Sequence, residues 1–375
     1  MTPSHQTSFR IESTRGDLVE SVHPVSVAVT DADGRLLAAA GDPGRLTYWR
    51  SAAKPFQAMP LVEDGAADAF GLTPEELALA CASHSSERRH LDVAAGFLAK
   101  IGCTEDQLAC GPHPPLGPAV AEMVLKSGLT LTPLWSNCSG KHAGMLALAR
   151  HHGWETQGYE RAGHPVQRRI LEAVLRWSGA APEDVALAVD GCTVVCFALP
   201  LRAMATAYAR FVASEEPAAV RLRAAMMGHP DLVAGTGRFC TELMAAWPGG
   251  VVAKVGAEGV YSAALVAPGW GITLKVADGD MRVAPVALFA VLRELAARWR
   301  GGMPGAGTPL EAPALLERWA EVPIRNTRGE LTGRLRPAGT LEWHMPEWRG
   351  PQGGAQAQDA PRAETMHARP SREVD

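Results

Sequence analysis

The chain has 375 residues, of which 47% are apolar and 20% are charged, and its formal net charge is −4. A sequence of this size and composition can bury a large core, and without a basic stretch it offers no surface for nucleic acid. No apolar run is long enough to predict a membrane span, and the polar segment 1–11 does not resemble a secretory signal. Seven scattered cysteines fit the reduced thiols of a cytoplasmic protein better than a disulfide framework.

The first elements predicted along the chain are a β-hairpin and a helix that begins at a serine. Segment 22–42 alternates apolar and polar residues around Asp33-Gly34, a dipeptide typical of hairpin turns. Apolar residues take a helical spacing from Ser51, and Pro55 is compatible with a helix only within its first turn. Further helices are expected at 74–82, 86–100, 118–127, 141–152, 164–178, 200–213, 215–228, 238–246 and 283–299, and further strands at 131–135, 186–189, 251–255, 259–267 and 270–277.

This order of elements predicts an α/β (α+β) fold in which helices flank one mostly antiparallel sheet and form a helical subdomain on one side. Residues 15–345 are expected to form a single domain, with the sheet built from 15–60 and 250–345 and a helical insert at about 61–249. Residues 1–14 are expected to be flexible. Segment 301–308 is predicted to be a Gly/Pro loop, and a shortage of large apolar residues predicts disorder for the tail 346–375.

Lysine is unusually scarce in this chain, since only six of the 36 basic residues are lysines. A guanidinium stays charged at any relevant pH, whereas a desolvated lysine amine can lose its proton and act as a base. Lysines that lie in short polar motifs are therefore candidates for catalysis. Three such motifs are Ser51-Ala52-Ala53-Lys54, Asn137-Cys138-Ser139-Gly140-Lys141-His142 and Lys254-Val255-Gly256.

The Ser-x-x-Lys motif at the helix start places Ser51 and Lys54 one turn apart on one helix face. A buried Lys54 amine could accept the Ser51 proton, although a helix cap followed by a solvated lysine has the same spacing. Lys254 ends an apolar strand before a glycine that lets a substrate approach, and here the alternative is a strand-end lysine that reaches solvent. Lys275 on the next strand is a second candidate for the same role. The order Ser-x-x-Lys, helical insert, Lys-x-Gly resembles that of penicillin-recognising serine enzymes.

Two further clusters concentrate polar groups. Segment 82–87 could supply a second activated hydroxyl and donors for a substrate, or it could be a series of N-cap residues in which Ser86 and Glu87 start the next helix. Ser83 and His84 precede that cap, so the N-cap interpretation does not explain them. Segments 137–142 and 190–192 bring together Cys138, Lys141, His142, Asp190 and Cys192. Their spacing is not that of a typical zinc motif, and buried cysteines that act as small apolar residues are common. Gly235-Thr236-Gly237-Arg238 is read as a turn before a helix.

Taken together, six segments resemble the L-asparaginase II family, the Rhizobium-type group, over roughly residues 15–345, which we therefore expect to be a catalytic domain. This resemblance implies a fold similar to glutaminases, serine β-lactamases and penicillin-binding proteins. The sequence departs from the family pattern at Thr193-Val194-Val195-Cys196, where smaller or Gly/Pro-containing residues are expected. The segments that carry the resemblance are 50–55, 82–85, 110–113, 137–142, 190–192 and 254–259.

The resemblance implies hydrolysis of L-asparagine to L-aspartate and ammonia by a cytoplasmic enzyme, which we expect to be a homodimer. It pairs Ser51 with Lys54 and Ser83 with Lys254 as two Ser–Lys tandems. A zinc site is implied at Cys138, Lys141 and Cys192. Substrate contacts are expected from Arg50, His84, His142 and Asp190.

Two other functions remain open from the sequence. One is a penicillin-recognising serine hydrolase, which a β-lactam substrate such as nitrocefin would reveal. The other is a non-catalytic zinc-binding protein of the same fold, which would bind zinc without amidase activity.

Overall fold

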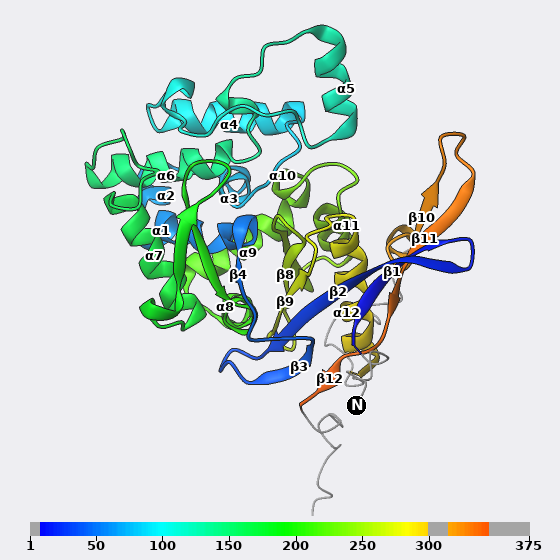
Figure 1. The fold of residues 1–375 in the computed structure, drawn as a ribbon. Coiled ribbons are helices and arrows are strands. Elements are labelled where there is room, and N and C mark those ends of the chain that lie inside the picture. The colour runs from blue at the N-terminus through cyan, green and yellow to red at the C-terminus, as the bar shows by residue number, and fades with distance from the viewer. Residues whose placement is uncertain (1–7, 299–313, 345–375) are drawn as a thin grey trace, which may run out of the picture.

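The computed structural model describes residues 8–298 and 314–344, in which a large antiparallel sheet lies beside a helical part (Figure 1). The predicted α+β architecture, an antiparallel sheet with flanking helices and a helical subdomain, is therefore confirmed. The Gly/Pro loop expected at 301–308 and the tail expected at 346–375 lie outside the described residues.

The large sheet has nine strands in the order β10-β11-β1-β2-β9-β8-β7, with β3 paired to β2 and β12 paired to β3. Every pairing in it is antiparallel. The longest strand, β2, pairs with β1 through its first half and with β3 and β9 through its second half. The nine strands are β1 (Arg10–Arg15), β2 (Leu18–Thr30), β3 (Leu36–Ala40), β7 (Val251–Val255), β8 (Val260–Leu265), β9 (Trp270–Val276), β10 (Val322–Arg325), β11 (Leu331–Ala338) and β12 (Glu342–Trp343).

Four of the nine strands, β1, β10, β11 and β12, were not predicted from the sequence. Strand β1 begins at Arg10, within the segment expected to be flexible, because Phe9 and Ile11 are buried against the core. Strands β10 and β11 have partly exposed faces that carry arginines, and the resulting weak apolar alternation explains why they were not predicted. By contrast, the hairpin expected around Asp33-Gly34 is present as β2 and β3, with Gly34 at φ +81°.

Strands β7, β8 and β9 are buried along their whole length, which explains their nearly continuous apolar sequence. Helices α8 (Leu201–Ala213) and α12 (Val283–Arg298) pack against them. Gly271 on β9 permits the closest approach, since a Cβ atom there would lie 1.9 Å from the Ala205 carbonyl oxygen of α8. Strand β7, which carries Lys254, lies at the edge of this sheet, where it pairs with β8 and packs against residues of 217–228 and 239–246.

The helical part fills the chain between β3 and β7 and is centred on α1 and α6. Almost every residue of α1 is buried, and so are the residues of α6 from Ser139 to Ala149, as expected for helices surrounded by other helices. The helices of this part are α1 (Lys54–Glu63), α2 (Ala66–Ala69), α3 (Pro74–Ala80), α4 (Arg88–Lys100), α5 (Pro118–Ser127), α6 (Ser139–His152), α7 (Pro165–Ser178), α8, α9 (Pro217–Gly228), α10 (Pro230–Val233) and α11 (Phe239–Ala246). A short α13 (Ala314–Glu317) follows α12.

Gly140 explains how α6 comes to lie close to the C-terminal end of α3. A Cβ atom at this position would lie 2.4 Å from the Leu79 carbonyl oxygen, so only glycine permits the approach. The strand expected at 131–135 is wrong: this segment ends in a short 3₁₀ helix, Pro133–Trp135, because a proline at its start cannot donate to a strand ladder.

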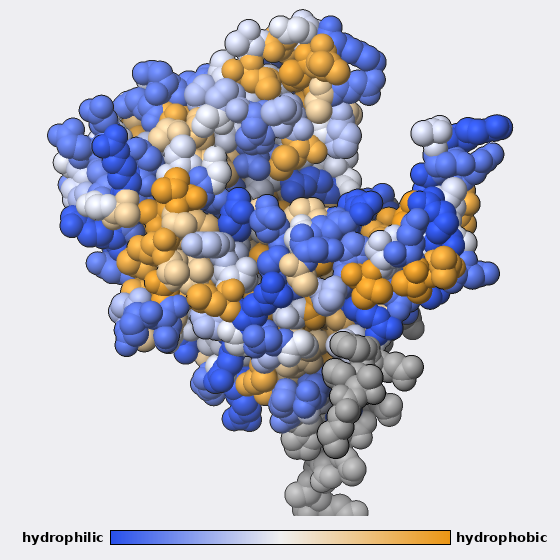
Figure 2. All heavy atoms as spheres, in the orientation of Figure 1, coloured by the Kyte–Doolittle hydropathy of each residue, from blue (hydrophilic) through white to orange (hydrophobic). Residues whose placement is uncertain are grey.

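A second, three-stranded sheet has the order β4-β6-β5 and lies within the helical part. Its strands are β4 (Leu46–Tyr48), β5 (Ala186–Val189) and β6 (Val195–Pro200), so the strand expected at 186–189 is present. Figure 2 shows apolar side chains gathered over this sheet and over α5, where Val189 and Leu125 are 78% and 83% exposed. Exposed apolar groups of this kind are typical of contact surfaces.

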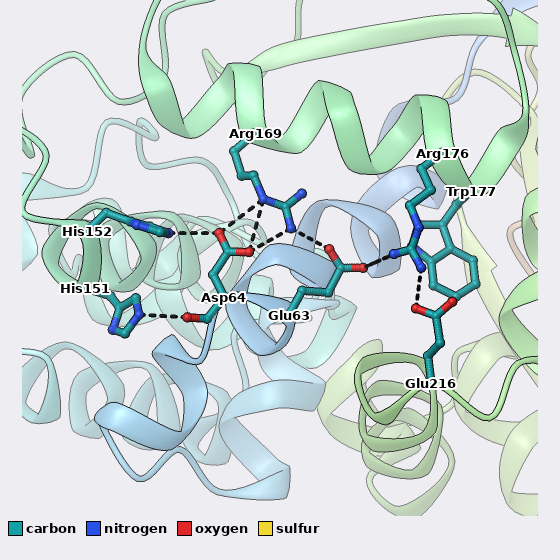
Figure 3. Close-up of polar contacts among 8 residues, drawn as sticks. All are labelled: Glu63, Asp64, His151, His152, Arg169, Arg176, Trp177 and Glu216. Atoms are coloured by element: carbon teal, nitrogen blue, oxygen red, sulfur yellow. Dashed lines mark hydrogen bonds and ion pairs between the residues drawn. The ribbon is translucent and has the colours of Figure 1, made fainter.

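The far ends of α1, α6 and α7 are tied together by an ion-pair network (Figure 3). Arg169 of α7 contacts Glu63 at 2.6 Å and Asp64 at 2.7 Å, at the C-terminal end of α1. His152, at the end of α6, contacts the same Asp64 at 2.9 Å. Because α1 and α6 carry the candidate lysines at their opposite ends, this network fixes the helices that position the site.

Candidate active site

Ser83 lies between the amines of two buried lysines. The Lys54 Nζ, at the first residue of α1, is 3.0 Å from the Ser83 Oγ, and the Lys254 Nζ, near the end of β7, is 2.8 Å from it. Both lysines are fully buried and Ser83 is 3% exposed. The structure thus brings three of the four candidate catalytic residues into one contact group, and it places Lys254 rather than Lys275 there.

Lys275 has a different environment. Its Nζ donates to the carbonyl oxygens of Glu258 at 2.5 Å and Val276 at 2.6 Å, so it links the turn before β8 to the end of β9. Of the two lysines left open in the sequence, Lys254 lies at a candidate serine, whereas Lys275 does not hydrogen-bond to either candidate serine among the described residues.

Burial favours the neutral form of both amines at Ser83. Desolvation lowers the pKa of Lys54, and the nearby Lys141 ammonium acts in the same direction. Desolvation lowers the pKa of Lys254 well below its ordinary value, and the Lys54 charge lowers it further. A neutral amine has one lone pair and two N–H groups. Lys254 donates to the Val255 carbonyl oxygen at 2.8 Å, which leaves its lone pair able to accept the Ser83 proton.

Ser51 does not contact Lys54 in the expected way. It lies in the 3₁₀ turn Arg50–Ala53 immediately before α1, is partly exposed, and its hydroxyl makes no hydrogen bond to any of the described residues. The Lys54 amine is directed instead to Ser83 and to the Ala82 carbonyl oxygen. The two lysines expected in separate tandems therefore share one serine.

Beside this group, two cysteines and a lysine form a second buried cluster. The Lys141 Nζ lies 2.9 Å from the Cys192 Sγ, and the Cys138 Sγ lies 2.9 Å from the Asn137 Oδ1. The hydrogen bond from Cys192, helped by the charges of Lys54 and Lys141, holds the pKa of the Cys138 thiol well below its ordinary value although burial opposes this. The pKa of Cys192 is raised, so Cys138 is the more acidic of the two thiols.

Arg50 and Asp190 place a pair of opposite charges at the edge of the site. The Arg50 Nε is 2.8 Å from the Asp190 Oδ1, which also accepts the Gly191 N–H at 2.8 Å. Burial alone would raise the pKa of Asp190, but the charges of Lys141 and Arg50 outweigh it and lower that pKa. Both side chains remain partly exposed, at 26% and 11%, so both can reach a small charged ligand.

The two histidines expected to bind substrate differ in whether a ring nitrogen is left without a hydrogen-bond partner in the described residues. Both ring nitrogens of His84 are engaged within the protein, since Nδ1 accepts the Ser86 N–H at 3.1 Å and Nε2 lies 2.9 Å from the Ser139 Oγ. His142 is also fully buried, and desolvation lowers its pKa well below the ordinary value. Its Nδ1 contacts the Tyr159 hydroxyl at 2.6 Å, but its Nε2 has no hydrogen-bond partner among the described residues.

The family model of L-asparaginase II matches residues 11–337 of this chain. The chain belongs to the L-asparaginase II family. Its residues thus support an asparaginase-type hydrolase, and a serine held between two lysine amines is a feature that such an enzyme can use. None of the curated proteins matches the chain. Among solved structures, a β-lactamase from Mycobacterium bovis aligns at 13% identity and a TM-score of 0.30, covering 72% of this chain and 94% of the β-lactamase.

The donor set at Cys138, Lys141 and Cys192 suits the zinc ion that the family resemblance implies. Zinc accepts two sulfur ligands and an amine nitrogen, the latter once Lys141 has lost its proton, and the lowered pKa of Cys138 favours the thiolate form that binds a metal. No group of three or more His, Cys, Asp and Glu side chains among the described residues is arranged to bind a metal, so Lys141 would have to be a ligand in this family member. The presence of zinc remains a prediction.

Backbone strain is concentrated around this site. Within residues 8–298 and 314–344, four residues other than glycine have a left-handed backbone. Each lies within four residues of a candidate residue along the chain, and Thr193, at φ +82°, stands where the family pattern predicts smaller or Gly-containing sequence. Such conformations cost about 1–3 kcal/mol each and persist where the surroundings fix them. The four are Arg50, Ser86, Thr193 and Glu258.

Two residues at the site were not found from the sequence. Tyr159 accepts the Ala109 N–H at 2.9 Å and orients His142, but it lies in a loop with no motif around it. Arg238 contacts the Ser83 carbonyl oxygen, and its segment was recognised only as the turn that precedes α11. As for membranes, none of the described helices is both long and apolar enough to cross one.

Proposed function

We propose that the chain is an L-asparaginase, an amidohydrolase that converts the side-chain amide of L-asparagine to L-aspartate and ammonia. Membership of the L-asparaginase II family supports the reaction class. The observation that carries the proposal is the Ser83 hydroxyl between the Lys54 and Lys254 amines, at 3.0 and 2.8 Å. Lysines of lowered pKa beside a serine are the arrangement needed to form an alkoxide-like nucleophile at neutral pH.

In the proposed mechanism, Ser83 attacks the amide carbon while its proton passes to the neutral Lys254 amine. The C–N bond then breaks, and the proton returns to the leaving nitrogen so that ammonia departs. Water hydrolyses the resulting acyl-enzyme in a second step that uses the same base. The Ser83 N–H already donates to the Val233 carbonyl oxygen at 2.9 Å, so the negative oxygen is stabilised instead by the positive charge that Lys254 gains with the Ser83 proton.

Ser51 is the second candidate hydroxyl. Its partial exposure and its place beside Arg50 put it closer to solvent than Ser83. If the acyl group forms on Ser51, then Ser83 relays the Ser51 proton to the lysines instead of attacking. Mass spectrometry of the enzyme quenched during turnover distinguishes these roles, because the acyl group is found on one serine peptide or the other.

The charged pair Arg50 and Asp190 suits the zwitterionic end of an amino acid. Arg50 would bind the α-carboxylate and Asp190 the α-ammonium, each in exchange for part of its contact with the other. The unpartnered Nε2 of His142 supplies a donor to the same ligand. A predicted zinc ion held by Cys138, Lys141 and Cys192 would add a fixed positive charge that orients the substrate.

An ammonia assay on the purified protein tests the proposal. The wild type should release ammonia from asparagine faster than from glutamine or other amides, and nitrocefin hydrolysis would favour a penicillin-recognising enzyme instead. Ser83→Ala and Ser51→Ala should each lose activity, whereas Ser178→Ala, a buried serine at the end of α7, should not. Full activity of Ser83→Ala would refute the assignment. The homodimer and the cytoplasmic location remain predictions.

A further inference from the structure

One loop fastens the whole segment that carries Ser83. We call residues 233–238, between α10 and α11, the clamp loop. Its Val233 carbonyl oxygen accepts the Ser83 N–H, and its Ala234 carbonyl oxygen accepts the Ser85 hydroxyl at 3.0 Å. The Thr236 N–H donates to Glu87 at 2.8 Å, so both ends of segment 83–87 are held. A Cβ atom at Gly235 would lie 2.4 Å from the Ser85 Oγ, which shows how closely the two segments pack.

Arg238 completes this contact with a charged side chain. Its Nη1 donates to the Ser83 carbonyl oxygen and, at 3.1 Å, to the Ala234 carbonyl oxygen. No carboxylate lies within ion-pair distance of Arg238 in the part of the chain that the structure describes. The neighbouring Arg318, by contrast, is paired with Glu242. A partly buried guanidinium without a counter-ion is costly, and a purely structural link to two carbonyl groups does not require a charge.

The charge of Arg238 acts on the site through space. It lowers the pKa of Lys254, in the same direction as burial and the Lys54 charge. The charges of Cys240 and Cys138 act in the opposite direction. The ionisable groups that face the Lys254 amine are Lys54, Cys81, Cys138, Arg238 and Cys240.

We propose that Arg238 is a positioning residue of this enzyme, which holds the Ser83 carbonyl so that the hydroxyl stays between the two amines and whose unpaired charge keeps Lys254 ready to accept a proton. This inference rests on the proposed role of Ser83 and Lys254. It adds a residue from a loop that is distant in the sequence from every motif of the site. A merely structural arginine would fix the loop but would leave the proton affinity of Lys254 unchanged.

Three variants separate these roles. Arg238→Gln keeps a donor for the Ser83 carbonyl oxygen but removes the charge, whereas Arg238→Lys keeps the charge and loses the forked geometry. Arg223→Gln is the matched control, because Arg223 also donates to backbone carbonyl oxygens, those of Phe211 at 3.3 Å and Val212 at 3.1 Å, away from the site.

The measurement is the pH dependence of two reactions of the full-length protein. The first is ammonia release from asparagine. The second is acetylation of Ser83 by p-nitrophenyl acetate, in which the Ser83 oxygen bonds to the acetyl carbon, p-nitrophenolate leaves and the serine proton passes to Lys254. Mass spectrometry of the Ser83 peptide confirms the site. The ester separates the proposed asparaginase function from the proposed role of Arg238. If the wild type is acetylated at Ser83 but releases no ammonia from asparagine, only the proposed substrate is refuted.

For Arg238→Gln, we expect the acid limb of both profiles to move to higher pH, because the removed cation no longer disfavours protonated Lys254. At pH 7 this should slow both reactions about tenfold, with recovery at higher pH. Arg238→Lys should keep the wild-type acid limb at a reduced rate, and Arg223→Gln should keep the wild-type profile. If the acid limb of Arg238→Gln stays at the wild-type pH, the inference is overturned, whatever the reaction rate of that variant. If that variant does not fold, a moved limb in Arg238→Lys overturns it, and so does a wild type in which Ser83 is not acetylated.

Discussion

Replacement of Lys254 by arginine gives the strictest test of the proposed base, because it keeps a basic side chain while removing the ability to lose a proton. The Lys254 Nζ lies 2.8 Å from both the Ser83 Oγ and the Val255 carbonyl oxygen, and the side chain is fully buried. A guanidinium there would be permanently charged, longer than the amine, and without a lone pair for the Ser83 proton.

The expected loss can be stated from the role assigned to the amine. General bases contribute between about 10²-fold and 10⁴-fold, so kcat/KM for asparagine should fall by about a thousandfold, or about 4 kcal/mol of transition-state stabilisation. Lys54→Arg should be damaging for the same reason. Lys126→Arg is the control, since the exposed Lys126 pairs only with Glu122 on the surface of α5.

Lys254→Met separates function from folding. We expect it to be inactive but at least as stable as the wild type, because it removes a buried amine whose neutral form costs free energy to maintain. The folded-state pKa of Lys254 is lowered, so the unfolded chain binds the extra proton and wild-type stability from this group rises with pH up to about 10.4. The gap in Tm between Lys254→Met and the wild type should therefore narrow as the pH rises towards that value.

Wild-type turnover by Lys254→Arg across the pH range would refute the deprotonable-lysine mechanism. A strongly destabilised Lys254→Met would show instead that the amine serves the fold. Ammonia release by a coupled assay and thermal unfolding by circular dichroism are sufficient to decide between these outcomes.

Three further predictions concern the surroundings of the site. Asp190→Asn should raise KM for asparagine about tenfold to a hundredfold with a smaller change in kcat, since a charged hydrogen bond to the substrate is worth about 1.5–3 kcal/mol. Arg169→Met should lower the free energy of unfolding, measured in urea, by about 1–2 kcal/mol, because Glu63 and Asp64 lose a partly buried partner. Metal analysis should find about one zinc ion per chain, lost in Cys192→Ser.

Each of these has a clear contrary result. An unchanged KM in Asp190→Asn would remove Asp190 from the substrate contacts. Arg88 forms only an exposed ion pair with Asp92, so Arg88→Met should lower the free energy of unfolding by only a few tenths of a kcal/mol. If Arg169→Met lowers it by no more than this, the ion-pair network does not stabilise the helices as proposed. A purified protein without bound zinc, or one that keeps its zinc in Cys192→Ser, would refute the predicted metal site.

The sequence predicted best those elements whose signals are local. Helix 118–127 and strand 251–255 occur with the predicted bounds, because proline at the start of one and a continuous apolar run in the other are sufficient to define them. Strands β10 and β11 were not predicted, since they form through long-range pairing. Strand β11 pairs with β1 in a register that places Ile11 opposite Pro337, more than 300 residues away in the sequence.

The site was predictable in its members but not in its connections. The motifs identified Lys54, Ser83 and Lys254 as reactive residues. The sequence could not show that the Ser83 hydroxyl contacts both lysines. These contacts form only when α1, the segment after α3 and strand β7 come together, and Ser83 is 29 residues from Lys54 and 171 residues from Lys254 in the sequence. Tyr159 and Arg238 had no local signal, because each acts through a contact that exists only after the helices have packed.

The left-handed residues around the site also bear on any attempt to make this enzyme more durable. Replacement of Thr193 or Glu258 by glycine would relieve backbone strain and would be favoured in a directed-evolution screen for heat resistance. The same changes would loosen the turns that carry Cys192 and follow Lys254, so heat-resistant clones would lose turnover. Mutations intended to raise thermal stability should therefore leave these turns unchanged and be placed on surfaces far from the site.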